Sequence, residues 1–578
     1  MMRILLLTRS FNSLTQRLYC ELIERRHEVS VEFDIHPDIT REAIALFRPD
    51  LVLAPFLKRA IPDDVWQHNT CLVLHPGPRG DRGPAALDWA ILNQEETWGV
   101  SVIEAREEMD AGPLWATADF PMRAAPKSSI YRHEVTESGV ACLLEALARF
   151  ESGAGPLALV NEAPDRGWQG PVPADLRRID WESDATADIL RKVRAADGQP
   201  GALDTGHERE WRLYGAEPAP GFGAGKRPGQ VLGTRDEAIC RATVDSAVWV
   251  RQVRIPQADN PGFKLPATRA LSSLATGLPD FPAPLVDDHE PFQEIRYHEL
   301  GRIGILEFDF YNGAMNTDRC RKLAHAYDYA RQRPTRAIIL RGGLDFWSNG
   351  MDLNCIEAAD SPADASWRNI NAMDDLCRRI IETDDRLTVA ALHGNAGAGG
   401  VFLALATDHV VARRGIVLNP HYKSMGNLYG SEYWTYVLPR RVGSEQAESI
   451  TQRRLPMLAA EARALGLVDE LAEGFGSTFF DHVLDSVGQR VTDPGFGQFV
   501  AAKRARRAGD EAKQPLSAYR DAELARMRMN FYGFDPSYHV ARYRFVTHEP
   551  HAWTPLYLAP HRSHDGGRQE PQAKAMPA

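Results

Sequence analysis

The chain has 578 residues, an ordinary globular composition and a formal net charge of −11, from 67 Lys and Arg against 78 Asp and Glu. This length is sufficient for several domains with large cores. The acidic balance argues against a general nucleic-acid binder, because such proteins carry basic patches. The seven cysteines are odd in number and include no CxxC pair, so neither a disulfide framework nor a metal site is expected.

The start and the most apolar segment of the chain both indicate a cytoplasmic protein. The first residues, MMRILLLTRS, are apolar only briefly, which is typical of a buried first strand and not of a signal peptide. The most apolar long run, Ala396–Thr407, is too short to span a membrane. We therefore predict a reduced, multidomain enzyme that has no membrane partner and no nucleic-acid partner.

Residues 1–165 are predicted to form an α/β domain with a doubly wound parallel sheet. Strands are expected at Arg3–Thr8, Val29–Phe33 and Leu51–Pro55, and helices at Leu14–Arg26, Arg41–Phe47 and Val135–Phe150. Alternation of this kind favours a parallel sheet with helices on both faces. The first strand is followed by TRSFNSLTQR and not by GxGxxG, so the dinucleotide-binding fingerprint is absent.

A candidate site follows the next predicted strand of this domain. The stretch Cys71–Leu92 ends its strand in His75 and continues into a glycine-rich loop that carries Asp81, and a second strand is expected to end in Asp110. Because both strands end here, we expect His75 and Asp110 to lie side by side. His75 is a candidate acid/base group or oxyanion donor, and Asp110 could orient it, raise its pKa or act as base. A purely structural His75 is the alternative.

Three further regions follow along the chain. Residues 166–285 are rich in Pro and Gly and carry short β-like pieces at 230–232, 238–244 and 248–253, which indicates a small β-barrel-like module with a linker. Residues 286–490 return to strand–helix alternation, residues 491–565 are helical in character, and residues 566–578 are expected to be a disordered tail. The basic stretch Lys503–Arg507 is interpreted as a solvated helix face.

The motifs of residues 1–255 resemble the formyltransferases that use formyl-tetrahydrofolate. That family carries Asn-x-His-Pro-Ser, then Arg-Gly, Trp-Ala and Asp-x-Gly-Pro, and the chain matches this pattern at His75, Arg82-Gly83, Trp89-Ala90 and Asp110. The resemblance implies formyl-tetrahydrofolate as formyl donor, His75 and Asp110 as catalytic residues, and a small C-terminal β-barrel after the catalytic domain.

One position departs from the formyltransferase pattern. The family's Asn falls on Val73, which has no polar group to donate to the formyl oxygen. Loss of one such donor typically raises the barrier by about 2.7–4 kcal/mol. A thiol acceptor would make the reaction easier, because a thiol pKa of about 8.5 makes the thiolate accessible near neutral pH. We therefore predict an acceptor other than the usual amine, and an inert folate-binding domain is the alternative.

Two glycine-rich turns mark a second candidate site. SNGMD and GNAGAGG each lie where a predicted strand passes into a helix. Two such turns can aim backbone N–H groups at one carbonyl oxygen and so form an oxyanion hole. Together with the segment 443–471, the turns resemble the crotonase (enoyl-CoA hydratase/isomerase) superfamily over about 290–475. The resemblance implies that the N–H groups of Met351 and Gly399 form the oxyanion hole.

The carboxylates of hydratases are absent from this region. Phe402 stands where hydratases carry their first catalytic Glu, and Pro420-His421 stands where they carry Pro-Glu, so hydration of an enoyl thioester is not expected. Glu432 is the nearest remaining carboxylate, and its aromatic neighbours would raise its pKa by desolvation. We predict Glu432 as acid/base with Tyr422 as its partner. The alternative is a surface residue on an aromatic-rich helix.

Over nearly its whole length, the chain resembles the HypX (HoxX) family of hydrogenase maturation proteins, including the ending SYHVARYRFV. The resemblance implies synthesis of the carbon monoxide ligand of NiFe-hydrogenase. Formyl transfer from formyl-tetrahydrofolate to coenzyme A would come first, and decarbonylation of formyl-CoA would follow. The pantetheine arm could carry the intermediate between the two sites. The expected partners are these small molecules and the hydrogenase maturation machinery.

Several basic and polar residues are candidates for binding coenzyme A. The resemblance implies contacts from Arg9, Gln16, Arg132, and Arg542 or Arg544. Four further arginines either bind coenzyme A phosphates or cap helices, and they are Arg440, Arg441, Arg453 and Arg454.

Two other functions remain open. A formyl-tetrahydrofolate hydrolase, or a transferase that stops at formyl-CoA, would release no carbon monoxide. A non-catalytic assembly factor would bind coenzyme A or folate without reaction.

Overall fold

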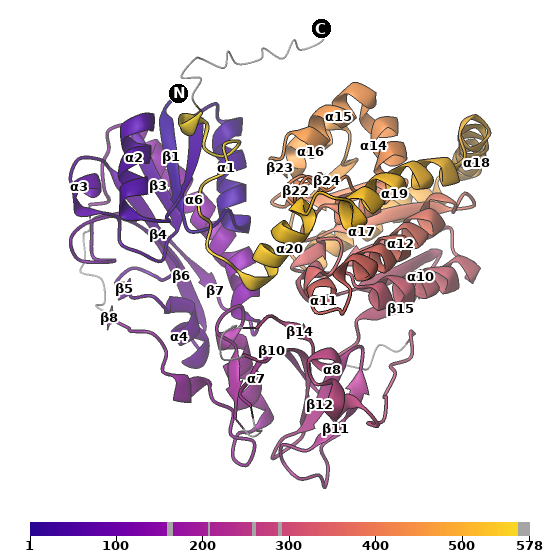
Figure 1. Ribbon diagram of the computed structural model, residues 1–578, viewed down its shortest axis with the longest axis horizontal. Helices are drawn as coiled ribbons and strands as arrows, with labels where there is room; N and C mark the ends of the chain where they lie inside the picture. Colours follow the sequence, from indigo (N-terminus) through magenta and orange to yellow (C-terminus); the bar gives the residue numbers. More distant parts are fainter. Residues whose placement is uncertain (159–165, 206–208, 257–261, 287–291, 564–578) are drawn as a thin grey trace.

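The computed structural model describes residues 1–158, 166–205, 209–256, 262–286 and 292–563. Figure 1 shows an N-terminal α/β body, a β-rich body below it and a second α/β body beside it. The C-terminal extension, drawn in yellow, crosses from the second α/β body back to the first. The tail predicted to be disordered, residues 566–578, lies outside the described residues.

The N-terminal body is built on a six-stranded sheet with the order β2-β1-β3-β4-β6-β7. Its strands are β1 (Arg3–Thr8), β2 (Glu28–Phe33), β3 (Leu51–Phe56), β4 (Cys71–His75), β6 (Thr97–Glu104) and β7 (Leu114–Pro121). Its main helices are α1 (Ser13–Glu24), α2 (Pro37–Phe47), α4 (Ala86–Leu92) and α6 (Thr136–Glu151), with short α3 (Asp63–Trp66) and α5 (Lys127–Ile130). A two-residue pairing joins β5 (Asp81–Arg82) to β8 (Gly167–Trp168).

Helices cover both faces of this sheet, as the alternation of strands and helices predicted. Ile4 and Leu6 of β1 are fully buried in the cluster that holds α1 and α6, whereas Leu5 and Leu7 are buried against α2. Successive side chains of a strand point to opposite faces, so a strand buried on both sides is apolar throughout. The α/β class is therefore confirmed.

The expectation of an entirely parallel sheet is wrong for two of the strands. β1 to β4 are mutually parallel, but β6 runs antiparallel to β4, and β7 runs antiparallel to β6. The loop of residues 76–85 stays at the carboxyl end of β4, so α4 does not return the chain to the far end of the sheet. Consequently Ser101 lies opposite His75, and β6 ends at Glu104, six residues before Asp110. Asp110 is therefore in a connection and not at a strand end.

The β-rich body is an open antiparallel sheet and not a barrel. Its order is β11-β12-β13-β10-β9, and within the described residues the two outer strands do not pair with each other. Its strands are β9 (Ala202–Asp204), β10 (Trp211–Pro218), β11 (Val231–Arg235), β12 (Ala238–Ala242), β13 (Ala247–Arg254) and β14 (Leu265–Pro266). The helix α7 (Thr186–Ala196) shares its core with this sheet, which removes the need for the sheet to close on itself.

The second α/β body contains two sheets. The larger has the order β15-β16-β17-β19-β21-β24, with β15 (Ile295–Leu300), β16 (Ile303–Phe308), β17 (Ala337–Gly342), β19 (Leu387–Leu392), β21 (His409–Arg413) and β24 (Glu470–Ala472). The smaller has β18 (Phe346–Ser348), β20 (Asn395–Gly397), β22 (Val417–Asn419) and β23 (Met457–Leu458).

Helices of this body pack around these two sheets. The longest are α10 (Thr317–Gln332), α12 (Pro362–Ile381) and α17 (Ser477–Thr492). The shorter ones are α11 (Leu353–Glu357), α13 (Gly399–Leu405), α14 (Trp434–Val442), α15 (Ser444–Gln452) and α16 (Ala459–Leu465). The short helices α8 (Ala267–Ala270) and α9 (Ser272–Ala275) precede this body and pack in the core of the β-rich body.

The C-terminal extension packs on the second body before it returns to the first. It comprises α18 (Phe496–Lys513), α19 (Leu516–Tyr532) and α20 (Ser537–Thr547), and α19 buries Leu524 and Met527 in the core of the second body. The interpretation of Lys503–Arg507 as a solvated face is wrong for Lys503. Its side chain is buried, forms an ion pair with Asp408 and donates to the carbonyl of Arg386 at 2.8 Å.

The last described residues, 554–563, form a strap along the edge strand β2. The N–H of Val31 donates to the carbonyl of Leu558 at 2.8 Å, and the N–H of Phe33 donates to the Thr554 hydroxyl at 2.8 Å. Between them the buried Glu32 carboxylate accepts from Arg562 at 2.6 Å and contacts His561 at 3.0 Å. Burial alone would raise the pKa of Glu32, but the bonds from His561, Thr554 and Arg562 hold it below its ordinary value. The strap thus satisfies an edge that would otherwise expose unpaired N–H groups.

We expect Glu32→Ala to detach the strap, because it leaves Arg562 without its buried carboxylate. Arg562 keeps its ion pair with the half-exposed Glu42, so the loss should lie at or below about 3–5 kcal/mol, the cost typical of a broken buried pair. Hydrogen exchange at the amides of Val31 and Phe33 measures the loss. The matched control is Glu28→Ala on the same strand, whose half-exposed ion pair with Arg3 should contribute little. Unchanged protection in Glu32→Ala would contradict the role assigned to this carboxylate.

Candidate active sites

The first candidate site lies at the carboxyl end of β4. His75 is buried, and its Nε2 lies 2.8 Å from Oδ2 of Asp81, while its Nδ1 lies 3.7 Å from Oδ2 of Asp110. The predicted pair of His75 and Asp110 is therefore in contact, although Asp110 reaches His75 from a loop. The hydrogen-bond partner of the ring is Asp81, which sequence reasoning noted in the loop but did not assign to the site.

Backbone geometry holds the two carboxylates of this site. Asp110 has a left-handed backbone with φ of 59°, and its Oδ2 accepts the N–H of Gly83 at 3.1 Å. Gly77 packs so closely on Asp81 and His75 that a Cβ there would lie 2.2 Å from Oδ2 of Asp81. Loop residues therefore enclose the imidazole between two carboxylates.

Val73 lies two residues before His75 on β4, so both side chains point to the same side of the sheet. Val73 packs against the apolar cluster that includes Leu5, Ala54 and Cys71. No amide occupies this position beside the imidazole, as the sequence indicated.

The second candidate site lies where two turns of the second body meet. A Cβ on Gly350 would lie 3.4 Å from the backbone nitrogen of Gly399, so the turn before Met351 touches the start of α13. Among the residues that the structure describes, no acceptor is bonded to the N–H of Met351 or of Gly399. Both N–H groups are thus available to a substrate oxygen.

Glu432 lies directly against this pair of turns. Its Oε1 would be 2.1 Å from a Cβ on Gly399, so only glycine fits there. Its Oε2 accepts the Tyr422 hydroxyl at 2.5 Å and the Ser431 N–H at 3.2 Å. Glu432 is 1% exposed, which excludes the alternative of a surface residue.

Burial governs the protonation of this site. Desolvation, followed by the negative charge of Asp374, raises the pKa of Glu432 to about 8. Burial and the neighbouring Glu432 also raise the pKa of Tyr422 well above its ordinary value. Tyr422 therefore remains a hydrogen-bond donor, and Glu432 is a carboxyl group that exchanges a proton near neutral pH.

The residues that replace the hydratase carboxylates support this arrangement. Phe402 is fully buried and stacks on Tyr422 with ring centroids 5.3 Å apart. His421 is also buried, and burial followed by the charge of Arg454 lowers its pKa to about 4. Phe402 has no titratable group and His421 is uncharged at neutral pH, so neither residue replaces the charge of a hydratase carboxylate.

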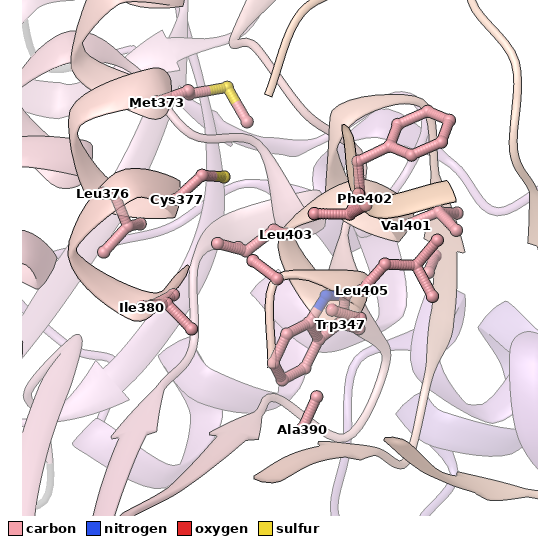
Figure 2. Close-up of a cluster of buried hydrophobic side chains, with 14 of the residues drawn as sticks. Trp347, Met373, Leu376, Cys377, Ile380, Ala390, Val401, Phe402, Leu403 and Leu405 are labelled. Carbon is pink, nitrogen blue, oxygen red and sulfur yellow. The ribbon is translucent and has the colours of Figure 1, made fainter. Parts of the chain in front are cut away.

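An apolar core supports α13 beneath the turns. Figure 2 shows Met373, Leu376, Cys377 and Ile380 of α12 beside Trp347 and Leu403, with Val401, Phe402 and Leu405 on the far side of α13, and all of these residues belong to one buried cluster. The Trp347 indole N–H donates to the carbonyl of Gly400 at 2.8 Å. This bond fixes the first turn of α13, and so the direction of the Gly399 N–H.

Two of the residues predicted to contact coenzyme A bridge the two α/β bodies. Oε1 of Gln16 accepts the Asn419 side chain at 3.0 Å. Arg132 lies in a π-helical turn, Tyr131–Val135, and pairs with Asp345 at 3.3 Å. Such π-helical turns often occur at functional sites.

The other predicted contacts with coenzyme A have partners within one body. Arg9 donates to the carbonyl of Asp34 at 3.4 Å. Arg542 is buried and pairs with Glu357 at 2.7 Å, whereas Arg544 is exposed and pairs with Glu549 at 3.4 Å.

The four further arginines all have partners of their own. Arg440 and Arg441 line a cavity of about 320 Å³ between α12, α14 and α18, and Arg441 also donates to the carbonyl of Thr407 at 3.1 Å, as a helix cap does. Arg453 pairs with Glu461 at 2.5 Å, and Arg454 donates to Asn427 at 2.7 Å. The structure therefore does not gather these four side chains into a single phosphate site.

Among the described residues, no three His, Cys, Asp or Glu side chains are grouped so that they could hold a metal ion. No helix in the described ranges has the length and apolar character needed to cross a membrane.

Comparison with known families identifies the two halves. A family model for enoyl-CoA hydratase/isomerase matches residues 306–527, and one for the formyl transferase C-terminal domain matches residues 172–260. A methionyl-tRNA formyltransferase from Aromatoleum aromaticum is 29% identical over 222 residues, which are 37% of this chain and 68% of that protein.

Two relatives match the whole chain. The hydrogenase maturation factor HoxX from Bradyrhizobium diazoefficiens is 55% identical over 566 residues, or 97% of each chain. The crystal structure of HypX from Aquifex aeolicus in complex with tetrahydrofolic acid has 49% identity and a TM-score of 0.93, and the match covers 97% of this chain and 99% of that chain. The chain therefore belongs to the HypX/HoxX family of hydrogenase maturation factors and joins a formyltransferase-type half to a crotonase-type half.

Proposed function

We propose that this protein makes the carbon monoxide ligand of NiFe-hydrogenase by formyl transfer from formyl-tetrahydrofolate to coenzyme A, followed by decarbonylation of formyl-CoA. The observation that carries the proposal is the buried Glu432 carboxyl against the Gly399 turn. A crotonase-type site without the hydratase carboxylates, but with one desolvated acid beside free N–H donors, suits removal of a proton from a thioester.

In the first step His75 manages the proton. The thiol sulfur attacks the formyl carbon, His75 takes the thiol proton, and the bond from carbon to the folate nitrogen breaks. His75 then gives the proton to that nitrogen. Asp81 and Asp110 flank the ring and would stabilise the positive charge that it carries between these events. The tetrahydrofolic acid in the crystal structure of HypX from Aquifex aeolicus supports folate as the donor.

Val73 is the reason that we assign a thiol as the acceptor in this step. Without an amide donor at that position, the developing negative charge on the formyl oxygen is less stabilised. A thiolate is a far better nucleophile near neutral pH than a protonated amine, and this advantage offsets the missing donor.

In the second step Glu432 is the base. The N–H groups of Met351 and Gly399 bind the formyl oxygen, and the Glu432 carboxylate takes the formyl proton. The bond from carbon to sulfur breaks, its electron pair leaves with the sulfur, and carbon monoxide departs. Glu432 then protonates the thiolate, which regenerates coenzyme A. The Tyr422 hydroxyl keeps Glu432 aimed at the turn throughout.

The position of Gln16 suggests how the two steps connect. Gln16 contacts Asn419, whose carbonyl accepts the N–H of Ala398, the residue before Gly399. A coenzyme A molecule held by Gln16 and Arg132 would therefore lie at the boundary of the two bodies, close to the second turn. A pantetheine arm tethered there would reach either site at high effective concentration.

Purified protein with formyl-tetrahydrofolate and coenzyme A should release carbon monoxide, measured with reduced myoglobin as a spectroscopic trap. His75→Ala removes the proton carrier, so the rate of folate deformylation should fall at least about 100-fold. Glu432→Gln should lower the rate of carbon monoxide release from added formyl-CoA by a similar factor. The exposed residues His68 and Glu445 provide matched controls, His68→Ala and Glu445→Gln.

Three results would contradict the proposal. Deformylation without carbon monoxide in the wild type would favour a hydrolase or a transferase that stops at formyl-CoA. Hydrogenase maturation that persists in both variants would favour a non-catalytic assembly factor. Full activity in Glu432→Gln would exclude Glu432 as the base.

The rate of carbon monoxide release from formyl-CoA should depend on pH through Glu432. The active form is the carboxylate, so the rate should rise as pH passes its pKa of about 8. Between pH 7 and pH 9 we expect an increase of about tenfold. A stopped-flow pH profile measures this rise in rate, and a flat profile would contradict the assignment of Glu432 as the base.

The same carboxyl should make stability depend on pH. The folded-state pKa of Glu432 is raised, so its contribution to stability is complete below the unfolded pKa and is lost as pH rises through about 8. The neutral Glu432→Gln side chain cannot ionise. Its melting temperature should therefore fall less between pH 6 and pH 9 than that of the wild type. If the melting temperatures of the two proteins fell equally between pH 6 and pH 9, a raised pKa of Glu432 would be excluded.

A further inference from the structure

Behind Glu432 lies a second set of buried acidic residues that the reaction above does not use. Asp374 comes from α12 and Glu523 from α19 of the C-terminal extension, and both are fully buried beside Ser431. The Ser431 hydroxyl lies 2.9 Å from Oδ2 of Asp374 and 3.2 Å from Oε2 of Glu523.

The geometry of this contact favours a proton on one of the two carboxyl groups. A serine hydroxyl has one hydrogen, so it can donate to only one of the two carboxyl oxygens. The other contact is a hydrogen bond only when that carboxyl retains its own proton. Two buried carboxylates, both ionised around one hydroxyl, would also repel each other strongly. The arrangement therefore favours one ionised and one protonated carboxyl, with Ser431 between them.

The two acids also hold the turn that carries Glu432. Oδ1 of Asp374 accepts the N–H of Glu432 at 2.8 Å. Glu523 accepts the N–H of Tyr433 at 3.0 Å and the N–H of Thr435 at 2.8 Å. Glu432 and Tyr433 both have left-handed backbones, with φ of 60° and 56°. Two consecutive non-glycine residues in that region are strained, and these hydrogen bonds hold them there.

We propose that Asp374 and Glu523 are positioning residues for the reaction at Glu432. They hold the Glu432 side chain against the Gly399 turn, and their negative charge makes the Glu432 carboxylate a stronger base. This inference rests on the proposed function of Glu432. It assigns to the C-terminal extension a part in the second site, because Glu523 belongs to α19.

The groups around Glu432 account for the electrostatic part of this role. The helix α12 contributes Asp374 and the Cys377 thiol, and α10 contributes the Cys320 thiol. The helix α19 contributes Glu523 and Arg520. Tyr422 donates a hydrogen bond to Glu432, and Tyr433 is its neighbour in the chain. Of these groups Arg520 alone is cationic, and its Nε lies 3.7 Å from Oδ2 of Asp374. Burial, followed by the charges of Asp374 and Glu523, therefore favours the protonated form of Glu432.

Asp374→Asn tests the proposal in the full-length protein. Its Oδ1 can still accept the Glu432 N–H, so the variant removes charge with little change of shape. We expect the midpoint of the pH profile for carbon monoxide release from formyl-CoA to fall by about one unit or more, and the plateau rate to fall about tenfold because the base is weaker. The KM for formyl-CoA should stay within about twofold, because neither acid is placed against the substrate.

Glu523→Gln is the second variant, so the test survives if Asp374→Asn fails to fold. It should shift the midpoint in the same direction. The exposed Asp364 of α12 and Asp521 of α19 give matched controls, Asp364→Asn and Asp521→Asn, which should leave the midpoint unchanged. A merely structural role would reduce the amount of folded protein and leave the midpoint in place. An unchanged midpoint in both buried variants would overturn the proposal.

An infrared titration of the carboxyl stretching band separates this inference from the proposed function. The band that Glu432→Gln removes should disappear near pH 8 in the wild type and at lower pH in Asp374→Asn. This shift is expected even if the wild type releases no carbon monoxide, a result that would contradict the proposed function alone. A band that titrates at the same pH in both proteins would overturn the inference.

Discussion

The second site depends on burying one carboxyl group without a cation against it. Glu432 is almost fully enclosed, and removal of an ionised carboxylate from water is costly unless it is paired or protonated. The structure resolves this by keeping the carboxyl protonated at neutral pH, because burial and the nearby acids disfavour its ionisation more than the Tyr422 hydrogen bond favours it. The same feature that makes the group costly to ionise makes its carboxylate a strong base.

Much of the surrounding architecture follows from this constraint. Phe402 occupies the place of a hydratase carboxylate and stacks on Tyr422, so an apolar ring supports the hydroxyl that donates to Glu432. The turn at Glu432 has a strained backbone that depends on acceptors from α12 and α19. The C-terminal extension therefore contributes to the site as well as covering the core.

Polar contacts and the C-terminal strap connect the two α/β bodies. Gln16 and Arg132 project from the first body and make polar contacts with the second. The strap of residues 554–563 returns from the second body and pairs with the edge of the first sheet. These contacts and the strap tie the two bodies to each other, which suits a reaction in which one small carrier would serve two sites.

Local sequence patterns determined the class of each body and supplied most of the candidate site residues. Apolar runs such as Arg3–Thr8 predicted the strands, since strands buried on both faces must be apolar, and the turns around Met351 and Gly399 followed from glycine-rich sequence alone. Tertiary structure decided the direction of β6, the openness of the β-rich sheet and the burial of Lys503. It also brought Asp81 to His75 and Asp374 and Glu523 to Glu432. These depend on contacts between residues far apart in sequence or on loop conformation, and a pattern of neighbouring residues contains no information about which distant charge will be buried beside it.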